Sequence, residues 1–172
     1  MSFYEMRKVF VFGTSHCFQR YSGREVSDCV FKFILAISAY CAKLNVKCIA
    51  EEMSVEALGR GFQSSCQKVS FDVCISHQFC DPDSTKRDEL GVRDINLINS
   101  DCFLQGLSDE LCQAEIRRNH AIRELYWYGR LISSDTWPVI FVCGAEHVNP
   151  FSLLLEDKGI AVQVIESDWI PT

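Results

Sequence analysis

The sequence predicts an α/β fold, a three-layer single domain with a mainly parallel central sheet flanked by helices. Three observations support this prediction. Short apolar runs alternate with segments of helical periodicity, two of these runs end in Gly-x-x-His, and no linker or repeat divides residues 1–172. Alternating strands and helices are typical of parallel sheets whose crossover helices cover both faces. We therefore expect one α/β domain over residues 1–172.

The first elements follow from the hydrophobic pattern. Residues 7–12 are an apolar run that ends in Gly, which is typical of a buried strand entering a turn. Residues 26–44 repeat apolar side chains at three- and four-residue steps, which predicts a helix, and Asn45 is expected to end it. A second strand over 46–50 then runs into Glu51-Glu52.

The central part of the chain is less regular. Ser54 is a candidate N-cap for a helix over 55–68, because a serine hydroxyl accepts hydrogen bonds from the first backbone N–H groups. A third strand is expected over 70–75. Residues 80–107 contain turn-forming residues and one helical turn that we expect to end at Gly91.

The C-terminal part returns to a clear alternation. A long helix is expected from Ser108 to Leu131, and Pro138 ends that region. Residues 139–143 form the fourth apolar run. We expect a further helix to begin at Asn149-Pro150, since proline suits the first helical position, and Gly159 to close it before a last strand over 160–165.

Composition and charge exclude several classes of protein. The hydrophobic content of 48% argues against disorder, and the net charge of −6 disfavours nonspecific nucleic-acid binding. No apolar run reaches the roughly 18 residues of a membrane span. Residues 1–8 do not resemble a signal peptide. We therefore expect a cytoplasmic protein with no membrane or nucleic-acid partner; whether it forms a homo-oligomer stays open.

The ten cysteines suit reduced, buried thiols better than disulfides or a zinc site. Most lie in apolar contexts, no C-x-x-C pair occurs, and nothing marks secretion. Cys17 and Cys80 are exceptions, because each lies beside a candidate site residue.

Candidate functional residues follow the predicted strands. His16 and His147 end the two Gly-x-x-His segments, the pair Glu51-Glu52 follows the second strand, and His77 follows the third. Ligands bind at the carboxyl ends of strands in open parallel sheets. Consecutive residues of an extended chain point to opposite faces, so we expect only one glutamate to face the site.

Two polar segments leave alternatives open. Residues 115–124 suit a solvated helix face, but Arg123 and Glu124 also suit a cleft, where an arginine binds anions or stabilises an oxyanion. We expect His120 at the surface. The segment with Asp81, Asp83 and Arg87 suits either a capped turn with a local ion pair or a lid that contributes acid ligands.

The paired segments GTSH at 13–16 and GAEH at 144–147 resemble the TraB/Tiki family, and more loosely the erythromycin-esterase-like and ChaN-like proteins. The acidic position of that family matches Glu51-Glu52. Its ERN-like helix matches Arg118-Asn119 or Arg123-Glu124. The resemblance spans most of the chain as scattered anchors and implies a hydrolase that uses His and Glu, with or without a metal.

Familiar alternatives lack their motifs. The sequence contains no Walker A loop, no G-x-G-x-x-G and no G-x-S-x-G elbow. We therefore expect hydrolysis of a small-molecule or peptide-like substrate. In the first version, His16, His147 and Glu51 or Glu52 bind a divalent metal (Mn, Co or Zn), a remaining carboxylate or His77 takes the proton from its water, and Arg123 stabilises the oxyanion.

Two alternatives remain. In a metal-free hydrolase, one histidine acts as general base. In the other, the same fold is a ligand-binding or sensing module without turnover, with haem or a nucleotide-like molecule as its ligand.

Overall fold

The central sheet has five strands, all parallel, in the order β5-β3-β6-β1-β7. The computed structural model describes residues 7–23 and 26–172. The strands are β1 (Lys8–Thr14), β3 (Cys48–Glu51), β5 (Ser76–Phe79), β6 (Val139–Gly144) and β7 (Ala161–Trp169). This arrangement confirms the predicted α/β class with a parallel sheet.

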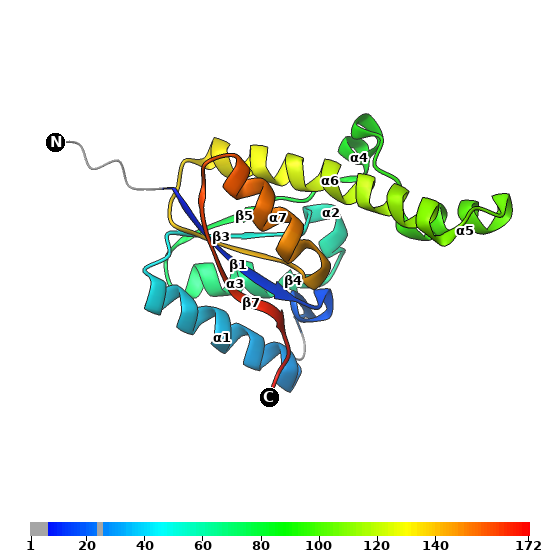
Figure 1. Cartoon of the computed structure of the whole chain (residues 1–172). Coiled ribbons are helices and arrows are strands. Elements are labelled where there is room, and N and C mark those ends of the chain that lie inside the picture. The colour runs from blue at the N-terminus through cyan, green and yellow to red at the C-terminus, as the bar shows by residue number, and fades with distance from the viewer. Residues whose placement is uncertain (1–6, 24–25) are drawn as a thin grey trace.

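Helices cover both faces of the sheet and complete the three layers (Figure 1). On one face, α1 (Asp28–Leu44) and α3 (Ser65–Asp72) bury aliphatic and aromatic side chains against the strands. On the other, α6 (Asp109–Ser134) and α7 (Ala145–Asp157) do the same, with Trp127 at the centre of the packing. The predicted three-layer arrangement is therefore confirmed.

Several predicted helix ends are confirmed by their backbone geometry. Asn45 ends α1 in the left-handed conformation, with φ at 50°. Gly91 ends α4 (Ser84–Leu90) in the same way, with φ at 69°. Ser54 and Ser108 cap α2 (Val55–Leu58) and α6, each accepting a hydrogen bond from a backbone N–H of the first turn. Local sequence therefore determines these boundaries.

The predicted helix over 55–68 is wrong, because the chain changes direction twice within it. Gly59 and Gly61 adopt φ values of 77° and 81°, which end α2 after a single turn. The strand β4 (Phe62–Ser64) follows and pairs antiparallel with β2 (Arg20–Ser22) in a separate two-stranded sheet. Only then does α3 begin.

The predicted strand over 70–75 is also wrong. Helix α3 continues to Asp72, and Cys74 turns the chain with φ at 56° before β5 begins at Ser76. The apolar run over 70–75 is typical of a strand, but its first half belongs to α3, whose Val69 and Ser70 are buried. His77 consequently lies within β5 and not beyond it.

Two other helices differ from the prediction. Residues 80–107 include α5 (Ile95–Gln105), which the hydrophobic pattern did not indicate. The expected helix start at Asn149-Pro150 is wrong, because α7 begins at Ala145 and contains Pro150 in its interior. Since the helix starts earlier, His147 lies in its first turn.

The carboxyl ends of the parallel strands meet at one edge of the sheet. The 3-10 helix η1 (His16–Phe18), α2 and the start of α7 follow directly from β1, β3 and β6 at this edge. Helices α4 and α5 lie at the end of the molecule to which the N-terminal half of α6 extends (Figure 1). Within the described ranges, none of the helices combines the length and apolar character that a membrane span needs.

Candidate active site

Glu52 is the centre of a polar cluster at the carboxyl edge of the sheet. Its side chain is almost completely buried. Oε2 accepts a hydrogen bond from the Gly144 backbone N–H at 2.8 Å, and Oε1 accepts one from the Arg123 guanidinium. A buried carboxylate needs such partners, because desolvation of an unpaired charge is costly. These bonds therefore hold the Glu52 carboxylate in one orientation.

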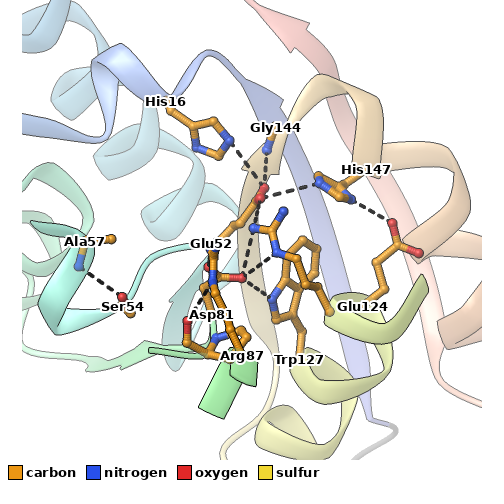
Figure 2. Close-up of polar contacts among 12 residues, drawn as sticks. His16, Glu52, Ser54, Ala57, Asp81, Arg87, Glu124, Trp127, Gly144 and His147 are labelled. Atoms are coloured by element: carbon orange, nitrogen blue, oxygen red, sulfur yellow. Dashed lines mark hydrogen bonds and ion pairs between the residues drawn. The ribbon is translucent and has the colours of Figure 1, made fainter. Parts of the chain in front are cut away.

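His16 and His147 lie on two sides of the Glu52 carboxylate (Figure 2). His16 Nε2 is 3.7 Å from Oε2, and His147 Nε2 is 3.4 Å from Oε1. The two imidazoles differ in exposure, since 48% of the His16 side chain is exposed but only 1% of the His147 side chain. The two Gly-x-x-His segments thus meet at one glutamate, with His16 on the solvent side.

The buried His147 is fixed by a second glutamate. Its Nδ1 lies 2.7 Å from Glu124 Oε1, and its ring packs against Trp127 and His120 at centroid distances of 4.8 Å and 4.3 Å. Its Nε2 is buried and makes no hydrogen bond among the described residues. A carboxylate on one ring nitrogen sets the tautomer and orientation of the other.

His120 is therefore not a surface residue, which corrects the expectation from the sequence. It is half-buried, and its position against His147 follows from the one-turn spacing between His120 and Glu124 on α6. Burial lowers the pKa of His120, and the nearby His147 and Arg123 lower it further. The side chain thus favours its neutral form inside the cluster.

Arg123 joins Glu52 to the segment after β5. Its Nη2 bonds Glu52 Oε1, and its Nε donates to Asp81 Oδ1 at 2.9 Å. Burial alone would lower the pKa of Arg123, but the charges of Glu52 and Asp81 outweigh it and raise the pKa. The guanidinium also lies 5.2 Å from the ring centroid of Trp127. This arginine is consequently a fixed, permanent cation beside His16 and Glu52.

The 81–87 segment has the cap and the local ion pair that the capped-turn interpretation expects, and the lid interpretation stays untested. Asp83 caps α4 by accepting the Lys86 N–H at 2.8 Å, as the capped-turn interpretation expects. Arg87 forms the local ion pair with Asp81. Asp81 is also buried, and its Oδ1 accepts the Trp127 indole N–H at 3.0 Å. Among the described residues, the segment thus bonds Arg123 and Trp127 but neither His16 nor His147.

A cavity of about 460 Å³ opens in front of the cluster. His16, Glu52 and Arg123 line it, whereas His147 lies behind them. The remaining lining residues come from eight different elements or loops: Cys17, Arg20, Met53, Ala57, Asp81, Arg87, Ile95 and Glu146. Of these, Arg20 and Ile95 had no signal in the sequence, while Glu146 stands inside the second Gly-x-x-His segment. The volume suits a small molecule.

Glu51 and His77 form a second cluster, separate from the first. Glu51 Oε1 lies 2.8 Å from His77 Nε2 and accepts a hydrogen bond from Ser64. Neither residue lines the cavity beside His16. As the alternation of an extended chain predicts, Glu51 and Glu52 diverge, and only Glu52 reaches the two Gly-x-x-His segments.

The two glycines of these segments have different structural roles. A Cβ on Gly13 would lie 2.2 Å from Ser167 O and 2.4 Å from Val148 Cγ2, so β1 and β7 approach too closely there for any side chain. Gly144 instead supplies the backbone N–H that binds Glu52, and a Cβ there would lie 2.8 Å from the Glu146 carboxylate. Glycine thus allows close approach at both strand ends.

The cysteines beside the site differ in accessibility. Cys17 is exposed and lines the cavity, and its Sγ is 3.2 Å from Ser15 Oγ. Cys80 is fully buried, and burial raises the pKa of its thiol well above its usual range. All ten cysteines are free, and six of them are buried. Cys80 is therefore a packed thiol and not a nucleophile.

His16, Glu52 and His147 are the candidate ligands for the expected divalent metal. Among residues 7–23 and 26–172, no group of three or more His, Cys, Asp or Glu side chains is arranged to hold a metal ion. Glu52 already binds the Arg123 guanidinium and the Gly144 N–H, and a cation beside a carboxylate opposes a second one. The residues as arranged do not fit a metal shared by His16, Glu52 and His147.

No family model, curated protein or solved structure matches this chain. The resemblance to the TraB/Tiki family therefore remains a hypothesis based on the paired motifs.

Proposed function

We propose that the protein is a hydrolase of small molecules in which His16 acts as general base and Glu52 orients it. The observation that carries this proposal is the contact between the half-exposed His16 and the buried Glu52 at the wall of the 460 Å³ cavity. A carboxylate behind an imidazole stabilises the imidazolium that forms when the base takes a proton.

The reaction uses a water molecule in the cavity. His16 Nδ1, the ring nitrogen that does not face Glu52, accepts a proton from the water as the water oxygen bonds to the carbonyl carbon of an ester or amide. The carbonyl π electrons move to the oxygen, and Arg123 stabilises the resulting negative charge. Collapse of this intermediate breaks the bond to the leaving group, which takes the proton from His16.

Two features of Arg123 support this role. It lines the cavity, and its hydrogen bonds to Asp81 and Glu52 use Nε and Nη2, which leaves Nη1 as a donor. Because Asp81 and Glu52 hold the guanidinium, little reorganisation is needed when charge develops. His147 and Glu124 support Glu52 from the buried side.

The test is turnover of a panel of p-nitrophenyl esters by the wild type and three variants. His16→Gln and Glu52→Gln should each reduce kcat/KM by about 10²- to 10⁴-fold. Glu51→Gln is the matched control, because Glu51 is the adjacent buried glutamate on the other cluster. Its activity per folded molecule should be unchanged.

The assay is run with a chelator and again with added Mn²⁺, Co²⁺ or Zn²⁺. Activity that persists with chelator supports the metal-free mechanism. Activity that requires one of these ions would contradict it and favour the metal-dependent version. Absence of turnover on the whole panel, with the fold intact by circular dichroism, would instead favour the ligand-binding module.

A further inference from the structure

Arg20 is a cation at the cavity wall with no carboxylate partner among residues 7–23 and 26–172. Its Nη1 donates to the Ala57 carbonyl at 3.1 Å, and its guanidinium lies 5.2 Å from the ring centroid of Phe62. Within the part of the chain that the structure describes, no Asp or Glu lies within 4.0 Å of it. The contact with Phe62 and the bond to Ala57 hold the side chain in place and leave several N–H donors.

The other cavity arginines are neutralised. Arg123 pairs with Glu52 and Asp81, and Arg87 pairs with Asp81. Arg87 is one third exposed, and its Nε and Nη2 are bonded to Pro82 O and Asp81. The positive charge of Arg20 is therefore uncompensated in a chain with 23 acidic and 17 basic residues. A fixed cation in a cavity concentrates anions there.

Glu146 gives the cavity a direction. It lies in the first turn of α7, a helix that carries none of the cavity arginines, and its side chain is about half exposed. Burial raises the pKa of Glu146, but a backbone hydrogen bond and the neighbouring His147, His16 and His120 lower it below its usual value. The carboxylate is thus ionised at neutral pH and repels an anion from its part of the cavity.

We propose that the substrate of this site carries a carboxylate or phosphate group that binds Arg20, while the bond to be hydrolysed lies at His16. That the bound anion belongs to a substrate rests on the proposed hydrolase function. The anion site itself is argued from Arg20 alone. Guanidinium groups bind planar carboxylates and phosphates through two parallel hydrogen bonds.

Binding is tested first without turnover. Inorganic phosphate, succinate and chloride are titrated at equal ionic strength into ¹⁵N-labelled protein, and backbone shifts at the cavity give the dissociation constants. Arg20→Gln should weaken binding of phosphate or succinate at least about tenfold. Arg117→Gln is the matched control, because Arg117 is also exposed and lies outside the cavity. It should leave binding unchanged.

The outcomes separate the sources of the anion. Binding of phosphate alone indicates a phosphate-bearing substrate, and binding of succinate alone indicates a carboxylate-bearing one. Binding of both indicates that the site accepts either group. Each of these results supports the proposal. Equal shifts with chloride, or equal weakening in Arg117→Gln, would overturn it.

A second measurement distinguishes this inference from the hydrolase proposal. A succinyl ester and a neutral acetyl ester of the same p-nitrophenol are compared as substrates. Arg20→Gln should lower the ratio of kcat/KM for the succinyl ester to kcat/KM for the acetyl ester about tenfold or more. Equal turnover of both esters by the wild type and by Arg20→Gln would contradict the anion inference and support the hydrolase proposal. Anion binding without turnover of either ester would support the anion site and contradict the hydrolase proposal.

Discussion

Replacing Arg123 with methionine tests the electrostatic centre of the site. Methionine retains much of the apolar volume but removes the guanidinium that bonds Glu52 and Asp81. The side chains of these carboxylates are only 2% and 3% exposed, so water solvates them poorly once the guanidinium is gone. Breaking a buried ion pair by removing one member costs about 3–5 kcal/mol, because it leaves an uncompensated buried charge.

The expected change in melting temperature follows from the length of the chain. Unfolding entropy near 60 °C is about 2.1 cal/mol/K per residue, which gives about 0.36 kcal/mol/K for this chain. A loss of 3–5 kcal/mol therefore lowers Tm by about 8–14 °C. Differential scanning calorimetry measures this change, and urea unfolding gives the free energy independently.

Two further variants make the test specific. Arg93→Met removes an arginine whose pair with Asp101 is exposed by 43% and 45%, so it should cost less than about 1 kcal/mol. Arg123→Lys keeps the charge but loses the planar guanidinium that bonds both carboxylates. Its loss of unfolding free energy should lie between those of Arg93→Met and Arg123→Met. If Arg123→Met costs no more than Arg93→Met, the reasoning that the guanidinium neutralises Glu52 and Asp81 is refuted.

Two other substitutions test the packing and the titration of the site. Gly13→Ala should destabilise the protein by about 1–3 kcal/mol in urea, because its Cβ would lie 2.2 Å from a backbone oxygen, whereas Gly129→Ala in open space on α6 should stabilise it by about 0.5–1 kcal/mol; equal effects would contradict the steric argument. His120→Gln should reduce the loss of stability below about pH 6.5. The pKa of His120 is lowered in the folded protein, where it faces His147, Arg123, Glu124 and Glu146, so its contribution is complete above the unfolded pKa and is lost as the pH falls through the folded one. A variant with an unchanged pH profile would exclude this contribution.

Much of the sheet could be predicted because its strands are short apolar runs ended by strong turn signals. The predicted strand over 7–12 matches β1 from residue 8 on, and residues 139–143 fall within β6; the ends of these two strands carry His16 and His147. The divergence of Glu51 and Glu52 could also be predicted, since it requires only the alternation of an extended chain. What depends on local geometry was therefore accessible from the sequence.

The partners of the site residues could not be predicted in the same way. His77 follows an apolar run as His16 does, yet it pairs with Glu51. The first half of that run is helical, and the strand begins only at Ser76, just after the predicted strand over 70–75 ends. The difference in exposure between His16 and His147 depends on where α6 packs, and nothing local to either motif encodes that contact.

The pairing of two adjacent glutamates with two different histidines explains how one strand end serves two clusters. Glu51 bonds His77 and Ser64, a contact that joins neighbouring strands β3 and β5 to the start of α3. Glu52 instead joins both Gly-x-x-His segments and α6 through charged groups. The Glu51 cluster does not line the cavity, whereas Glu52 does. Substitutions at Glu51 should therefore change stability alone, and substitutions at Glu52 should change both stability and catalytic activity. This separation is the physical basis for using Glu51 as the matched control for Glu52.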